Sequence, residues 1–182
     1  MRFINKVIKF TRLIKNKTWR KGLLNNIAAN IELENLIRDL KFETILDVGS
    51  NKGQFILLVE KFFKNKIIYS FEPISEILDK QKKFFGYKKN IYFFNIGIGE
   101  KSQKKNFYIT NRKDSSSFLK VDKNINKNKD YNIKEQREIQ IKSLDDIIIN
   151  ANSITPILIN IDVQGYELEV LKGSTSLLKK VK

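Results

Sequence analysis

The segment Glu43-Thr-Ile-Leu-Asp-Val-Gly-Ser-Asn-Lys-Gly-Gln-Phe55 organises this chain of 182 residues. A short apolar run in the segment carries one acid, Asp47, and is followed by Gly49 and Gly53. Apolar residues then recur at the spacing of a helix as far as Phe63. Glycines permit a tight turn between elements of these two kinds. The segment therefore predicts a strand, a tight turn and a helix, which form the first unit of an α/β fold.

The turn has the pattern Gly-x-Asn-x-Gly, which lacks the middle glycine of the dinucleotide fingerprint Gly-x-Gly-x-x-Gly. Asn51 adds a side chain where a pyrophosphate needs bare backbone, and the carboxylate of Asp47 repels phosphate and attracts an amine. S-adenosylmethionine (SAM) carries both an ammonium and a carboxylate, and fits such a turn better. We therefore predict that Asp47, Gly49, Asn51 and Gly53 form part of a SAM site. The alternative is that the glycines serve only the shape of the turn.

Two further apolar runs end in polar residues that suit a nucleoside. The run 67–71 ends before Glu72, about 20 residues past the glycine turn, where an acid accepts hydrogen bonds from ribose hydroxyls. The run 90–96 is aromatic and β-branched, and Asn95 near its end is a candidate for binding the adenine edge. A solvated carboxylate at Glu72 and a simple turn residue at Asn95 are the alternatives.

A fourth apolar run, 156–162, is nearly continuous, as a buried parallel strand should be. It should lie beside the first strand, across the point of the sheet where ligands bind. Asp162 at its end would then face the reacting end of the pocket. Upstream, segments 106–110 and 138–141 alternate like a pair of antiparallel strands. The polar residues between them predict either a substrate loop or irregular surface.

The first 40 residues differ in character from the rest, and we treat 1–40 and 41–182 as two parts. Residues 1–21 hold eight basic residues, no acid, and apolar residues near helical spacing. Such a helix can lie on an anionic membrane surface, or pack on the domain with its lysines in water. A second helical pattern from Leu23 to Leu40 would cover one side of the pocket.

Composition limits the chemistry that is available. The chain has no Cys and no His, which excludes disulfides, thiol catalysis and the commonest general base, and leaves no sign of a metal site. No apolar run is long enough to cross a bilayer. The net charge of +15 invites a nucleic-acid partner, but lysine is abundant throughout, so we expect compositional bias instead. Oligomeric state is beyond the sequence.

Taken together, these blocks resemble the FkbM-family methyltransferases over roughly residues 25 to 182. The blocks that carry the likeness are Ile45-Leu-Asp-Val-Gly-Ser-Asn-Lys-Gly-Gln-Phe55, Phe71-Glu-Pro73, Asn95-Ile-Gly-Ile-Gly-Glu100, Ser115-Ser-Ser117, Lys142-Ser-Leu-Asp-Asp146 and Asn160-Ile-Asp-Val-Gln-Gly-Tyr-Glu-Leu-Glu-Val-Leu-Lys-Gly173. The last block is the most specific to the family, whereas the first occurs in many methyltransferases.

The resemblance implies an α/β fold: a Rossmann-like class I methyltransferase sheet in three αβα layers. It implies an enzyme that uses SAM to methylate a hydroxyl of a sugar, a polysaccharide precursor or another small metabolite. We expect the protein to be cytoplasmic, either free or at the membrane surface through residues 1–21. Asp162 would lie on the substrate side, and with no His available it is our candidate general base. The alternatives are a nucleic-acid methyltransferase and a non-catalytic basic binding module.

The chain departs from the family pattern in two ways. Asn160 and Gln164 stand where the family often has Lys and Glu, so any role for those charges is lost. The family fold usually continues through more strands, whereas this chain stops at Lys182. We therefore expect a sheet that lacks its C-terminal strands and has an unpaired apolar edge at the fourth strand.

Overall fold

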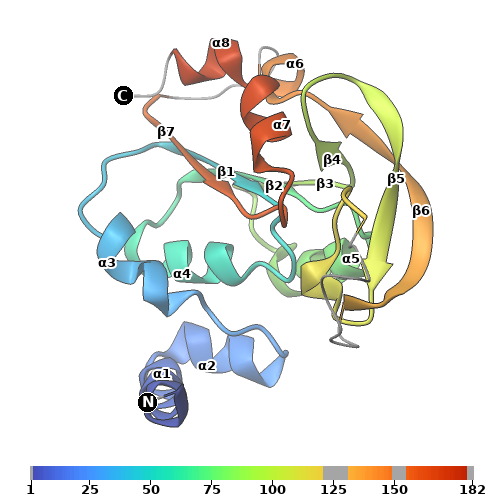
Figure 1. Cartoon of the computed structure of the whole chain (residues 1–182). Helices are drawn as coiled ribbons and strands as arrows, with labels where there is room; N and C mark the ends of the chain where they lie inside the picture. Colours follow the sequence, from blue (N-terminus) through green and yellow to red (C-terminus); the bar gives the residue numbers. More distant parts are fainter. Residues whose placement is uncertain (1, 121–130, 149–154, 180–182) are drawn as a thin grey trace.

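The computed structural model of the chain describes residues 2–120, 131–148 and 155–179 (Figure 1). Its centre is a parallel sheet of four strands in the order β3-β2-β1-β7. The strands are β1 (Thr44–Val48), β2 (Ile67–Phe71), β3 (Ile91–Phe94) and β7 (Ile157–Ile161). Their positions confirm the four strands predicted from the apolar runs. The first three strands are added toward one edge of the sheet, and β7 is then added on the other side of β1. This strand order is that of a Rossmann-like α/β sheet.

The side chains of β1 divide between two helical layers, because successive residues of a strand point to opposite faces. Ile45 packs into the core beneath α4 (Gln54–Phe62). Leu46 and Val48 pack into the core beneath α6 (Leu144–Ile148) and α7 (Glu167–Lys172). The short α8 (Thr175–Leu178) completes the second layer (Figure 1). The predicted three αβα layers are therefore present.

Helix α5 (Ser75–Phe85) follows β2 and shares the core of α4 through Phe84 and Phe85. The N-terminal helices α1 (Arg2–Lys15) and α2 (Lys17–Leu24) lie beyond α4, at the foot of the molecule in Figure 1. They are attached by Trp19, which is buried and donates its indole N–H to the carbonyl of Leu57 at 2.9 Å.

The predicted helix from Leu23 to Leu40 is wrong as a single element. In its place the chain leaves α2, runs through irregular backbone, and forms a 3₁₀ turn, η1 (Ile31–Leu33), and a one-turn helix, α3 (Glu34–Ile37). The interruption begins at Asn26, whose φ of 59° lies in the left-handed region. Asparagine tolerates that conformation and commonly ends helices, which the apolar spacing alone does not reveal.

A second sheet of three strands, in the order β4-β6-β5, stands beside the first (Figure 1). It is formed by β4 (Gly97–Ile98), β5 (Gln103–Thr110) and β6 (Ile133–Lys142). The antiparallel pairing of β5 with β6 confirms the predicted excursion. After β5 the chain turns through η2 (Lys113–Ser115). Residues 121–130 of the predicted polar loop lie outside the described residues.

Strand β7 is hydrogen-bonded only to β1 within the described part of the chain, so it forms one edge of the parallel sheet. This edge strand contains four apolar residues and one asparagine, which agrees with the apolar edge expected from the sequence. None of the described helices combines the length and the apolarity that crossing a bilayer requires.

Candidate functional site

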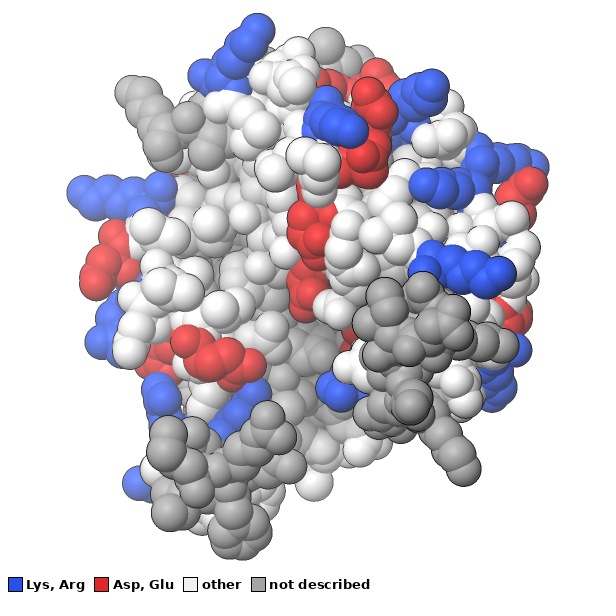
Figure 2. Space-filling view, viewed as in Figure 1, with Lys and Arg blue, Asp and Glu red and all other residues white. Residues whose placement is uncertain are grey.

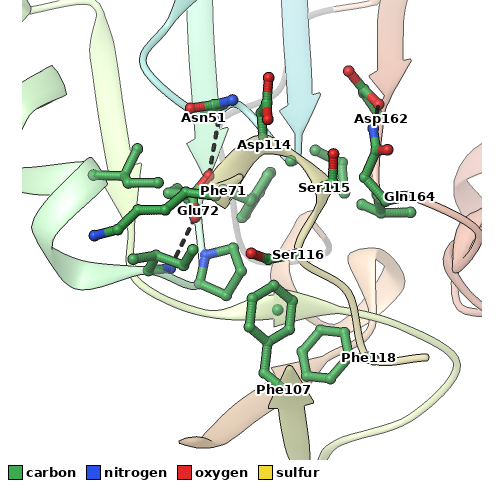
Figure 3. Close-up of a pocket in the computed structure, with 18 of the residues that line it drawn as sticks. Asn51, Phe71, Glu72, Phe107, Asp114, Ser115, Ser116, Phe118, Asp162 and Gln164 are labelled. Atoms are coloured by element: carbon green, nitrogen blue, oxygen red, sulfur yellow. Dashed lines mark hydrogen bonds between the residues drawn. The ribbon is translucent and has the colours of Figure 1, made fainter. Parts of the chain in front are cut away.

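A cavity of about 370 Å³ opens where the carboxyl ends of β1, β2 and β7 meet the second sheet (Figure 3). Ligands of open α/β sheets bind at this position, and the volume is within the roughly 300–1,000 Å³ of small-molecule sites. The predicted site residues that line it are Gly49, Asn51, Glu72 and Asp162.

The glycine loop between β1 and α4 is held close to both neighbouring strands. The backbone N–H groups of Gly49 and Ser50 both donate to the carbonyl of Phe71, at 3.0 Å each. Gly49 has a φ of 80°, and a Cβ there would collide with the backbone carbonyl of Asp162. Only glycine lets the loop pass this close to the end of β7, so the first glycine of the motif serves the shape of the pocket floor.

Glu72 joins the end of β2 to the glycine loop. One carboxylate oxygen accepts the backbone N–H of Asn51 at 2.9 Å, and the other accepts the N–H of Ile74 at 2.8 Å (Figure 3). Burial raises the pKa of Glu72 to about 7, against the lowering effect of these two hydrogen bonds. Each carboxylate oxygen has a second lone pair, so both remain able to accept hydrogen bonds from a ligand.

A buried polar network supports the loop from behind. The hydroxyl of Ser70 on β2 donates to Gln81 at 2.7 Å, and the amide of Gln81 donates to Ser50 at 2.8 Å. The same amide also donates to the backbone carbonyl of Asn51. Asn51 itself has a φ of 48°, a left-handed conformation that side chains other than Asn and Asp rarely adopt. Glu72 and Gln81 therefore hold the N–H and the carbonyl of this left-handed residue.

Asp47 lies in β1, two residues before Gly49, and is fully buried. One carboxylate oxygen accepts the amide N–H of Asn160 at 2.8 Å, whereas the other has no hydrogen-bond partner among the described residues. Burial raises the pKa of Asp47 to about 7, and the nearby Asp162 raises it further. An unpaired buried carboxylate oxygen is costly, so this group favours a cation or a hydrogen-bond donor at the adjoining site.

Asp162 follows β7 and faces the cavity (Figure 3). Partial burial raises the pKa of its carboxyl group, as do the charges of Glu167 and Asp114, while a hydrogen bond from Gln164 lowers it. Figure 2 shows acidic side chains in a band over α7 and the end of β7. Although the whole chain has a net charge of +15, this side of the cavity is anionic.

Three predicted residues do not line the cavity. Asp47 is fully buried and does not line it. Gly53 is the N-cap residue just before α4, and its missing side chain makes room for the ring of Phe85. Asn95 donates its side-chain amide to the backbone carbonyls of Glu72 and Pro73, at 2.9 and 3.0 Å, so it holds the end of β2. The neighbouring Ile96 lines the cavity instead.

The cavity also has walls that sequence reasoning missed. Asn30 lies in the irregular segment just before η1 and lines the cavity. No motif around it in the sequence indicates that it would do so. The aromatic rings of Phe107 and Phe118 form part of the wall, with centroids 4.8 Å apart. The turn at η2 contributes further lining residues: Arg112, Lys113, Asp114, Ser115 and Ser116. The serines at 115–117 were the available signal for this turn, because they lie in the polar segment that the sequence predicts to be either a substrate loop or irregular surface.

Metal-binding geometry is not seen in the part of the chain that the structure describes: no group of three or more acidic residues could hold an ion there. Two acids of the cavity have partners within the protein. Glu72 accepts backbone N–H groups, and Asp114 forms an ion pair with Arg112 at 2.8 Å.

Comparison with known proteins gives a family and two distant likenesses. The family model of the methyltransferase FkbM domain matches residues 47–182. No curated protein matches the chain. The structure of tRNA (m1A58) methyltransferase TrmI from Aquifex aeolicus is similar at 20% identity and a TM-score of 0.26, over 43% of this chain and 27% of that one. The plantazolicin methyltransferase BamL, solved with a triazolic desmethylPZN analog and SAH, is similar at 16% identity and a TM-score of 0.29.

The BamL likeness covers 51% of this chain and 34% of that one, so the chain spans about a third or less of either structure. Likenesses this weak carry no weight for function. The family match covers the glycine loop, Glu72 and Asp162, and extends over more than half of the sequence. This chain therefore belongs to the family of the methyltransferase FkbM domain.

Proposed function

We propose that this protein transfers the methyl group of SAM to a hydroxyl of a sugar, a polysaccharide precursor or another small metabolite. The observation that carries the proposal is that one cavity holds the glycine loop, Glu72 and Asp162 together. In a chain of a methyltransferase family, these are a nucleoside-binding end and a proton acceptor within one small-molecule site.

The residues present fit SAM in charge. Its sulfonium and ammonium groups are cationic, and the cavity is lined by Glu72, Asp114 and Asp162 against Arg112 and Lys113. The unpaired oxygen of the buried Asp47, two residues before Gly49, supplies a further negative charge, which an ammonium group stabilises. The opposite electrostatics would suit a phosphate-rich dinucleotide, so this balance favours SAM.

Individual residues have distinct roles in holding SAM. Glu72 accepts hydrogen bonds from the ribose hydroxyls with the lone pairs that the backbone leaves free. The loop at Gly49 and Asn51 leads into the N-terminus of α4, whose free N–H groups and positive dipole end attract a carboxylate. The aromatic and aliphatic walls exclude water from the remainder of the cavity.

Asp162 is our candidate general base. When bound, SAM supplies an electrophilic methyl group on a sulfonium. The carboxylate of Asp162 would take the proton of the acceptor hydroxyl as that oxygen receives the methyl group. A raised pKa makes this carboxylate a stronger base than an ordinary aspartate. Gln164, which donates to the same carboxylate, fixes its orientation.

The first test is whether the purified full chain binds SAM. We expect SAM to raise its melting temperature and to give a saturable calorimetric signal, because a ligand that binds only the folded state stabilises it. Absence of both signals would favour the non-catalytic basic module and overturn the proposal.

The second test identifies the acceptor class by the release of S-adenosylhomocysteine. Free sugars, nucleotide sugars and other hydroxylated metabolites should be compared with RNA and DNA under the same conditions. We expect turnover with a hydroxylated small molecule. Turnover with nucleic acid alone would replace our proposal with the nucleic-acid alternative. A cytoplasmic location is part of the proposal, and cell fractionation tests it.

A further inference from the structure

The N-terminal helices have an inner face that is fixed to the domain. Leu13 of α1 and Trp19 of α2 are buried. Ion pairs from Lys9 to Glu32 at 2.8 Å and from Arg12 to Glu34 at 2.6 Å hold α1 in place. The helices are therefore not a loose extension, and whatever their outer face presents is presented in a fixed geometry.

The outer face of α1 exposes apolar side chains that no described residue covers. Val7, Phe10 and Ile14 recur at helical spacing, which places them along one stripe, and Phe10 is 56% exposed. Ile8, on another side of the helix, is also exposed. A soluble surface helix normally has polar residues at such positions, so this stripe marks an interaction surface.

A basic hollow of about 360 Å³ lies next to the stripe, where α2 meets the end of α5. Arg20 connects the two features, because it lines the hollow and donates to the backbone carbonyl of Ile14 at 3.0 Å. Lys21 also lines the hollow, with its ammonium 5.4 Å from the ring centroid of Tyr87. Leu24 and Tyr87 at the hollow are 82% and 66% exposed.

The positive charge of this region is largely uncompensated. Residues 1–31 contain eight basic residues and no acid. Among the described residues, no carboxylate pairs with Lys17, Arg20 or Lys21. The one acid that lines the hollow, Glu60, pairs with Lys88. The hollow therefore has an affinity for anions that the protein itself does not satisfy.

We propose that the outer face of α1 and α2 docks on an anionic lipid bilayer, with lipid phosphates in the basic hollow and the apolar stripe at the acyl boundary. Helices that lie in the membrane interface typically combine basic residues with exposed aliphatic and aromatic side chains, as α1 and α2 do. A nucleic acid would bind the cations but leave the stripe in water. A second copy of the chain would bring two uncompensated basic surfaces together.

The experiment is cosedimentation of the full chain with vesicles. Phosphatidylcholine vesicles that contain phosphatidylglycerol are compared with vesicles of phosphatidylcholine alone, and we expect strong binding only to the former. The paired variant Lys17→Gln and Lys21→Gln should lower the partition coefficient about thirtyfold, since each lysine near an anionic surface contributes about 1 kcal/mol. Phe10→Ser, which leaves the charge unchanged, should lower it about fivefold to tenfold.

The matched control is Lys101→Gln with Lys142→Gln, which removes the same charge from exposed positions near the second sheet. Equal losses in the two lysine pairs, or equal binding to both kinds of vesicle, would overturn the proposal in favour of a diffuse basic surface. Insensitivity to Phe10→Ser together with tight binding to RNA would overturn it in favour of nucleic acid. A dimer in sedimentation velocity that Phe10→Ser abolishes would overturn it in favour of a second copy.

Discussion

The carboxylate of Glu72 accepts the backbone N–H of Asn51 at 2.9 Å and so ties the end of β2 to the glycine loop of β1. Two motifs separated in the sequence thereby act as one unit. The acid fixes the loop in its left-handed conformation, and the loop in turn orients the acid toward the cavity. Replacing either residue should affect ligand binding and loop geometry together.

Replacing Glu72 with Ala should weaken SAM binding by about 1.5 to 3 kcal/mol, the range for hydrogen bonds to a charged acceptor. The melting temperature without ligand should fall as well, because two backbone N–H groups lose their partner. Calorimetry measures the affinity. Glu76→Ala is the matched control, since Glu76 is exposed and pairs with Arg137 away from the loop. Unchanged affinity in Glu72→Ala would refute its assignment.

Asp47→Asn should stabilise the ligand-free protein at neutral pH while weakening SAM binding. The folded-state pKa of Asp47 is raised from 3.8 to about 7, so between these values the folded state holds a proton that the unfolded state releases. Stability from this group is therefore full below about pH 4 and is lost as pH rises to about 7. Asn cannot ionise, so the melting temperatures of variant and wild type should converge in acid. Parallel melting curves across this pH range would contradict the expectation.

Asp162→Asn should bind SAM normally and lower kcat by about a hundredfold to ten-thousandfold, the usual contribution of a general base. The Kd for SAM comes from calorimetry, and kcat from release of S-adenosylhomocysteine once an acceptor is known. Asp114→Asn is the comparison within the same cavity, because Asp114 is already paired with Arg112. A wild-type rate in Asp162→Asn would remove this residue from the mechanism.

Gln164→Leu should shift the acid limb of the pH–rate profile to higher pH. The Gln164 amide donates to the Asp162 carboxylate and lowers its pKa. Without that hydrogen bond the pKa rises, so the carboxylate form that acts as the base is reached only at higher pH. The variant should retain its SAM affinity. A lower rate with no change in the pH profile would show that Gln164 only positions the loop after β7.

Gly49→Ala should destabilise the fold more than Gly165→Ala. Both glycines have positive φ values, 80° and 95°, so both substitutions share the cost of about 1–2 kcal/mol of placing a side chain there. A Cβ at Gly49 also meets the backbone carbonyl of Asp162, whereas one at Gly165 meets only the flexible end of Leu119. Denaturant titration of the two variants gives the difference, and equal destabilisation would mean that the loop relaxes away from β7.

Local pattern was enough for the four parallel strands, because each is a short apolar run with a charged or polar residue at or near its end. It was also enough for the pairing of β5 with β6, where alternation marks both partners. The same pattern failed for residues 23–40, because apolar spacing does not report a left-handed asparagine that ends a helix. Motif position predicted that Gly53 and Asn95 belong to the cofactor site. In the structure Gly53 makes room for the ring of Phe85, and Asn95 holds the end of β2.

The sequence by itself determined the α/β architecture, the family, and the acids at the ends of the strands, since these depend on residue type and spacing along the chain. Only the tertiary structure decided which side chains share the cavity. Asn30, Phe107 and the turn at η2 reach it from distant segments, and the unpaired oxygen of Asp47 becomes visible only once its surroundings are packed. Burial and hydrogen bonding are properties of neighbours in space, and a linear pattern contains no record of them.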